Sequence, residues 1–133
     1  MAIKALSYLG VTSEKIQDWS YYATKNLGMQ EIDKTKNSLM LRMDDQKQRF
    51  SISNDGGEGL SFLGWEVENK GDLDNIASKL DKNNVKVSRG KKFLCDKRFV
   101  EDLIFFNDPA GNQIELIFNP LKTEEEFKPG RAI

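Results

Sequence analysis

Glu115 is the residue of this chain whose surroundings most demand a chemical partner. It lies in the segment 104–118, IFFNDPAGNQIELIF, where two apolar runs of β type flank a turn sequence. Pro109 and Gly111 stand where a type I turn or short hairpin loop favours a fixed φ and a positive φ. Along the second run Ile114, Leu116 and Phe118 share one face, while Glu115 points to the other with Gln113 and Ile117. A carboxylate there needs a metal, a cation or a hydrogen-bond donor, so metal ligation and a purely structural role are both open.

The 133 residues include no histidine and a single cysteine, Cys95. The absence of histidine excludes Ser-His-Asp and Cys-His mechanisms, imidazole acid–base catalysis and zinc sites of the Cys/His kind. A lone cysteine forms no internal disulfide, which fits a reducing cytosol. Chemistry within this sequence would rely on carboxylates, Lys, Tyr or Cys95. We therefore predict no catalytic and no cofactor-binding residues, and expect this chain alone to be inactive.

Charge and hydropathy limit the partners. Twenty basic and 21 acidic residues give a net charge of −1, which offers no electrostatic case for binding nucleic acid or an anionic membrane. The basic pairs at 91–92 and 97–98 read as a solvated loop. The N-terminal sequence lacks the apolar core of a signal peptide, and no run reaches transmembrane length. We expect a cytoplasmic protein with neither a nucleic-acid nor a membrane partner.

The chain contains an internal repeat. YLG at 8–10 and FLG at 62–64 each stand on a strand that leads into a helix. In the first half we expect a strand at 3–11, a helix from an N-cap at Ser13 to Gly28, and strands at 29–35, 38–44 and 48–54. In the second half we expect a strand at 60–68, a helix opened by Gly71 and Asp72, a short strand at 85–87, a polar loop at 88–99 and a hairpin at 100–107/112–119.

Each half therefore has the order βαβββ, which predicts an α+β fold. Two such modules, 1–55 and 60–119, would form one domain, 1–119, shaped as an incompletely closed barrel, with edge strands protected by pairing between modules. The glycine-rich segment 54–59 reads as a linker between them, since it lacks the spacing of a phosphate-binding loop. The tail 120–133 follows.

The repeated order with DPAGNQIEL in the second half resembles the vicinal-oxygen-chelate fold of the glyoxalase and bleomycin-resistance superfamily. That resemblance makes Glu115 the counterpart of a metal-ligand Glu on the strand after a D-P-x-G-N turn. Two further ligands of the family, usually His, fall on Tyr8 and Phe62. Phe62 cannot ligate a metal and Tyr8 could do so only as a phenolate. These three positions are thus degenerate, and we expect no metal in this chain.

A closer resemblance is to the N-terminal domain of type I extradiol ring-cleavage dioxygenases, such as the 2,3-dihydroxybiphenyl 1,2-dioxygenases. It rests on Trp19 with LG at 27–28, GWEV at 64–67 and FKPG at 127–130. The resemblance implies a parent enzyme of aromatic hydrocarbon catabolism that cleaves a small aromatic diol with O₂. Its Fe(II), or Mn(II), and the acid–base His would belong to a C-terminal catalytic domain beyond this chain. This domain would then serve packing and homo-oligomer contacts, with the tail crossing to the other half and Phe127 as its anchor.

Two other readings stay open. One is a free-standing small-molecule binding protein of the bleomycin-resistance type, which uses an apolar cup without metal. Its candidate aromatic lining consists of Tyr8, Trp19, Phe62, Trp65, Phe105 and Phe106. The other is a structural or adaptor domain with neither parent enzyme nor ligand. A chain that continues past Ile133 with two His and a Glu on corresponding strands would favour the dioxygenase.

Overall fold

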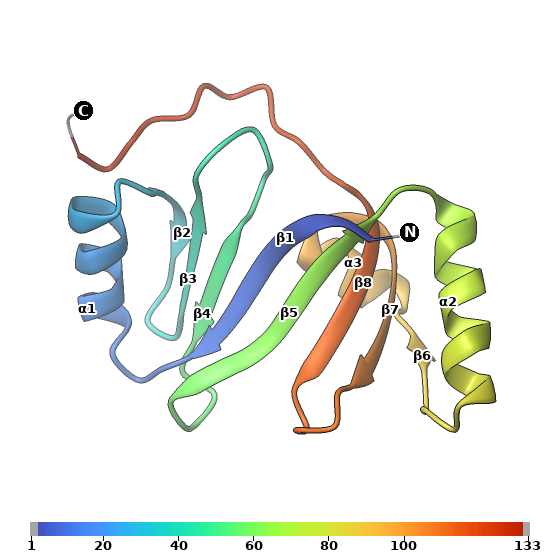
Figure 1. Ribbon diagram of the computed structural model, residues 1–133. Coiled ribbons are helices and arrows are strands. Elements are labelled where there is room, and N and C mark those ends of the chain that lie inside the picture. Colours follow the sequence, from blue (N-terminus) through green and yellow to red (C-terminus); the bar gives the residue numbers. More distant parts are fainter. Residues whose placement is uncertain (1–2, 132–133) are drawn as a thin grey trace. The chain divides into compact units, whose positions relative to one another are not determined.

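The computed structural model describes residues 3–131 of the chain. Within them, residues 8–61 and 122–131 form one compact unit, and residues 3–7 and 62–121 form another. We call them the β1–β4 unit and the β5–β8 unit after the strands they contain (Figure 1). No helix between residues 3 and 131 has the length and apolar character needed to cross a lipid bilayer.

The β1–β4 unit contains the first predicted βαβββ module. Its elements are β1 (Ile3–Thr12, from Tyr8 onward), α1 (Ile16–Tyr21), the π-helical turn η1 (Tyr22–Asn26), β2 (Gln30–Lys34), β3 (Ser38–Arg42) and β4 (Phe50–Ser53). β1 runs parallel to β4, and β3 is antiparallel to both β4 and β2. The buried cluster between helix and sheet consists of Ile16, Ala23, Leu39, Leu41 and Ile52. Ile16 and Ala23 of the helical segment face the sheet in this cluster, whereas Leu27 is half exposed.

The first helix begins later than the sequence predicts. Ser13 was the expected N-cap, but α1 begins at Ile16 with Lys15 in the N-cap position. The Ser13 hydroxyl instead accepts a hydrogen bond from the Lys15 N–H at 3.1 Å, a turn that competes with helix capping. The helical segment continues from α1 through η1 to Asn26, and Gly28, with a φ of +75°, follows its end as expected.

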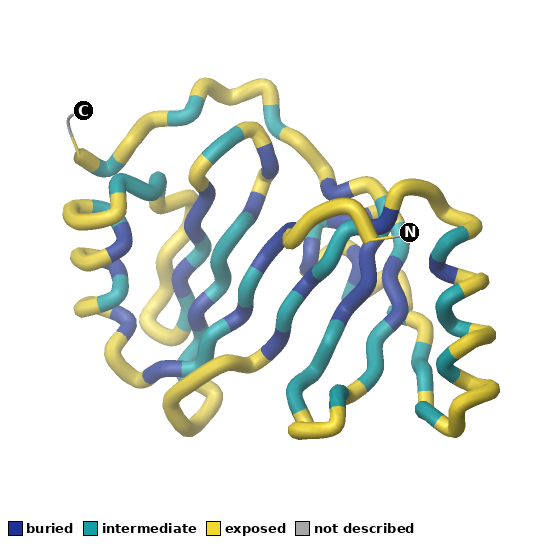
Figure 2. Tube along the Cα trace, in the orientation of Figure 1, coloured by how far each residue is buried: buried dark blue, intermediate teal, exposed yellow. Residues whose placement is uncertain are grey.

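The β5–β8 unit contains the second module. Its elements are β5 (Gly59–Val67, from Phe62 onward), α2 (Lys70–Lys82), β6 (Ser88–Arg89), α3 (Lys92–Arg98), β7 (Val100–Asn107) and β8 (Gln113–Pro120). β5 is parallel to β8, β8 is antiparallel to β7, and β7 is antiparallel to β6. The buried cluster under α2 consists of Val67, Leu73, Ile104 and Leu116. Figure 2 shows buried positions along β7 and β8 and the exposed outer side of α2.

Three local predictions in this unit were wrong. Residues 88–99 are not a loop, because they contain β6 and the seven-residue helix α3. The short strand lies at 88–89 and not at 85–87. Helix α2 begins at Lys70, one residue earlier than expected. The reason is a reciprocal capping box between Asn69 and Asp72, with hydrogen bonds of 3.1 and 3.2 Å.

The tail after β8 packs on the β1–β4 unit. The Thr123 N–H donates to the Asp45 carbonyl at 2.9 Å. The guanidinium of Arg42, which is only 2% exposed, donates to the Glu125 carbonyl at 2.8 Å and lies 5.9 Å from the centre of the Phe127 ring. Phe127 thus contacts the first module. Whether the tail leads on to a further domain, as the sequence predicts, stays a prediction.

Candidate functional site

The β7–β8 hairpin positions Glu115. At its tip the Gly111 N–H donates to the Asp108 carbonyl at 2.9 Å, which is the predicted turn, and Gly111 has a φ of +86°. The Asp108 carboxylate accepts the N–H groups of Ala110 and Asn112 at 2.9 and 2.8 Å. These bonds hold the pKa of Asp108 below its ordinary value of 3.8. A turn so fixed sets the register that pairs Glu115 with Phe105.

Glu115 is completely buried and its partner is a cation. The Nε of Arg98 donates to Oε1 at 2.9 Å, and its Nη2 donates to Oε2 at 3.0 Å. The Gln113 side-chain amide donates to Oε2 at 2.9 Å. Both carboxylate oxygens are therefore occupied, in the bidentate arrangement that gives the strongest hydrogen bonds between charged groups.

Arg98 comes from the last turn of α3 and is 9% exposed. Its guanidinium carbon lies 3.6 Å from the centre of the Phe62 ring, a cation–π contact. Phe62 is on β5, opposite Gln113 in the parallel β5–β8 pair. Helix α3, strand β5 and strand β8 therefore each contribute one side of this buried cluster.

Two of the three degenerate ligand positions, Phe62 and Glu115, lie together in this cluster. Tyr8 is 3% exposed and belongs to the β1–β4 unit. Among residues 3–131, no three His, Cys, Asp or Glu side chains are arranged so that they could hold a metal ion. The residues around Glu115 do not fit a metal, because a phenyl ring stands in a ligand position and an arginine already neutralises the carboxylate.

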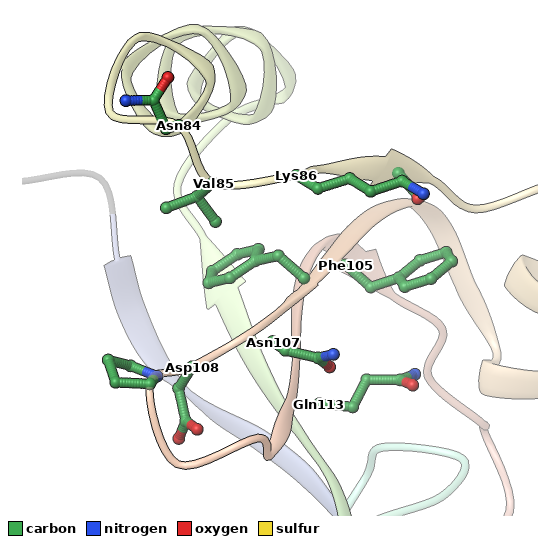
Figure 3. Close-up of a pocket in the computed structure, with 10 residues that line it drawn as sticks. Asn84, Val85, Lys86, Phe105, Asn107, Asp108 and Gln113 are labelled. Atoms are coloured by element: carbon green, nitrogen blue, oxygen red, sulfur yellow. The ribbon is translucent and has the colours of Figure 1, made fainter.

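A hollow of about 550 Å³ opens beside the cluster, on the β5–β8 unit. Figure 3 shows Phe105, Asn107 and Gln113 of the hairpin facing Val85 and Lys86, with Asn84 and Asp108 at the margin. Gln113 links this hollow to the buried pair, since the same side chain donates to Glu115. The hollow is open to solvent and combines an aromatic wall with polar groups.

The aromatic residues proposed for a binding cup mostly pack elsewhere. Trp19 packs on Phe50, with ring centres 5.8 Å apart, in the core of the β1–β4 unit. Trp65 and Phe106 pack against the cluster under α2. Of the six, Phe105 and Phe106 line the hollow, while Phe62 stacks on Arg98.

Arg98 is the site residue that the sequence does not reveal. It belongs to the basic pair at 97–98, which was interpreted as part of a solvated loop. The sequence indicates that Glu115 needs a partner such as a cation. It does not indicate which basic residue of the segment 88–99 lies next to Glu115 in the fold. Of the pair, Lys97 is exposed and Arg98 is buried.

Known proteins give this geometry a context. A family model described as dihydroxybiphenyl dioxygenase BphC D1 matches residues 6–54. Biphenyl-2,3-diol 1,2-dioxygenase of Paraburkholderia xenovorans (strain LB400) is 31% identical over 134 residues, which cover 100% of this chain and 45% of that protein. The 1,2-dihydroxynaphthalene dioxygenase of Pseudomonas sp. (strain C18) is also 31% identical, and the match covers 99% of this chain and 44% of that protein.

Solved structures with a similar fold are also dioxygenases. A crystal structure of catechol 2,3-dioxygenase matches with a TM-score of 0.93 and 31% identity, covering 100% of this chain and 45% of that one. This likeness confirms the predicted α+β fold class of the vicinal-oxygen-chelate kind. The chain spans about 45% of the length of the relatives it matches. By sequence and by fold, the chain is similar to extradiol dioxygenases and corresponds to their N-terminal half.

Proposed function

We propose that this chain is the metal-free, non-catalytic half of an O₂-dependent extradiol dioxygenase that acts on a catechol of the 2,3-dihydroxybiphenyl kind. Its own role is structural: it supports a C-terminal catalytic domain and contributes to contacts in a homo-oligomer. The tail 120–133 leads toward that domain. The whole protein is cytoplasmic and serves the breakdown of aromatic compounds.

The observation that carries the proposal is the pattern of coverage. Relatives named as dioxygenases for biphenyl-2,3-diol and 1,2-dihydroxynaphthalene match this chain over 99–100% of its length but over only 44–45% of theirs. A chain with no histidine can match such enzymes throughout if their reaction is carried out in the remaining part. The catalytic metal, Fe(II) or Mn(II), would be held there and would supply the site for the diol and O₂. No step of ring cleavage is assigned to a residue of this chain.

The second candidate is a free-standing binding protein for a small aromatic molecule. The hollow beside Phe105 is the observation that favours it, since aromatic walls with a few polar groups are usual in ligand sites. Against it, Tyr8 is buried, Phe62 stacks on Arg98, and Trp19 and Trp65 are partly buried against the two core clusters.

Oxygen uptake by the whole gene product tests the proposal. The protein is loaded with Fe(II) and mixed in turn with biphenyl-2,3-diol, 1,2-dihydroxynaphthalene and catechol. We expect oxygen uptake with at least one diol and one metal ion per chain. Absence of uptake with all three, in protein shown to hold iron, would overturn the dioxygenase assignment.

A variant locates the metal. Glu115→Gln, assayed below its unfolding temperature, should keep the metal content of the unsubstituted protein, because Glu115 is bonded to Arg98 and not to a metal. Loss of the metal in this variant would contradict the proposal that the metal lies outside this chain.

A further inference from the structure

The cluster around Glu115 is built for a planar cation. The two N–H groups of Arg98 meet the two carboxylate oxygens of Glu115 edge to edge, at 2.9 and 3.0 Å. The flat face of the same guanidinium lies 3.6 Å from the centre of the Phe62 ring. A fork of donors and a flat, weakly hydrated face are properties of guanidinium that neither an ammonium group nor a metal ion shares.

The remaining contacts fit the same cation. Gln113 donates to Oε2 of Glu115 at 2.9 Å and so fixes the carboxylate in the plane that Arg98 requires. Phe62 is 8% exposed and Glu115 is fully buried, so water has little access to compete for the charges. A buried carboxylate without a counter-charge would be strongly destabilising.

The backbone delivers Arg98 to this place. Phe99, directly after it, has the left-handed conformation with a φ of +57°, which ends α3 and turns the chain into β7. The Phe99 carbonyl accepts the Leu121 N–H at 2.8 Å, beyond the end of β8. The end of α3 is thereby tied to β8 through the backbone of Phe99 and through the side chain of Arg98.

We propose that Glu115, Gln113 and Phe62 form a guanidinium-binding site, with Arg98 as its built-in ligand at the position where the family resemblance places a metal. The arginine supplies the positive charge that a metal would supply and adds a covalent tie to α3. This inference rests on the β5–β8 unit alone. It would stand even if the whole protein proved to have no dioxygenase activity.

Removing the head group of Arg98 should leave a site that free guanidinium can fill. Arg98→Ala is introduced into the full gene product, and thermal unfolding is followed with and without millimolar guanidinium chloride, far below denaturing concentrations, against sodium chloride at equal ionic strength. We expect Arg98→Ala to lower the unfolding midpoint by on the order of 10 °C. Guanidinium, but not sodium, should raise that midpoint with saturation.

The matched control is Arg89→Ala, which removes an arginine that is half exposed and bonded to Asp74 and Asp102. Its midpoint should not respond to guanidinium. An equal response of both variants, no response of Arg98→Ala, or a larger recovery with Mn²⁺ than with guanidinium would each overturn the proposal.

A measurement on the unsubstituted protein keeps the proposal testable if Arg98→Ala fails to fold. The Nε–H proton of Arg98 should exchange with water much more slowly than that of Arg89. The Arg98 side-chain protons above the Phe62 ring should also be shifted upfield by its ring current. Exchange as fast as that of Arg89, with no ring-current shift, would refute the buried stacked geometry.

Discussion

Glu115→Gln is the substitution that tests the buried pair most severely. It keeps the volume of the side chain but removes the negative charge that balances Arg98. Because Glu115 is fully buried, water does not reach the site to compensate for that loss. The amide also presents an NH₂ group where the structure has an oxygen, so one of the two Arg98 N–H donors faces another donor. Breaking a buried pair on one side typically costs about 3–5 kcal/mol, so we expect a loss of that order in the free energy of unfolding.

The assay is equilibrium unfolding in urea, followed by tryptophan fluorescence. Trp65 reports on the β5–β8 unit and Trp19 on the β1–β4 unit, so each unit contains one probe. With an m-value of roughly 1–3 kcal/mol per molar urea, the expected loss lowers the midpoint by about 1 M or more. The control is Asp96→Asn, which breaks the exposed pair with Lys92 and should leave the midpoint unchanged. A Glu115→Gln midpoint equal to that of Asp96→Asn would refute the reasoning.

Three further results are expected. Arg42→Met should release the tail, seen as faster amide hydrogen exchange at residues 122–131, because the buried guanidinium holds the Glu125 carbonyl. The Asp108 carboxyl should titrate below 3.8 by NMR. A depressed pKa stabilises the folded state above pH 3.8 and this stabilisation is lost as the pH falls through the folded-state pKa. Because burial raises the pKa of the Cys95 thiol above 9.0, it should react slowly with thiol reagents at neutral pH and rapidly after unfolding.

Each of these has a contradicting outcome. Unchanged exchange of the tail in Arg42→Met would mean that the other tail contacts suffice. The control is Arg49→Met, which breaks the ion pair of Arg49 with Asp44 in the loop between β3 and β4. An Asp108 pKa at or above 3.8 would show that the turn N–H groups do not stabilise its charge. Equal reactivity of Cys95 before and after unfolding would contradict its burial.

The elements with strong periodicity could be predicted from the sequence. The alternation around Glu115 and the turn residues Pro109 and Gly111 predict the β7–β8 hairpin. The repeat of YLG and FLG predicts the βαβββ order that the first half has, whereas the second half adds helix α3 between its second and third strands. The alternation and the turn are local signals, since they depend on residues a few positions apart, and the repeat compares YLG at 8–10 directly with FLG at 62–64. The family resemblance also led to the extradiol dioxygenases, which the comparisons confirm.

The partner of Glu115 could not be predicted. Helix α3 is short, has no apolar stripe and leaves Phe93 77% exposed, so its sequence has no helical signature. The helix ends at Phe99, which has the left-handed conformation that glycine and asparagine usually adopt, so the sequence does not indicate this end. Which of two neighbouring basic residues turns inward depends on that backbone reversal and on tertiary packing.

The mass of the gene product in its native host tests the central claim most directly. The proposal that this chain is the non-catalytic half of a two-part dioxygenase predicts a polypeptide of about twice 15.2 kDa that contains these 133 residues. Intact-mass spectrometry, after capture through an epitope in this chain, gives the answer. A native product of 15.2 kDa would contradict the claim and leave a free-standing binding protein as the better account.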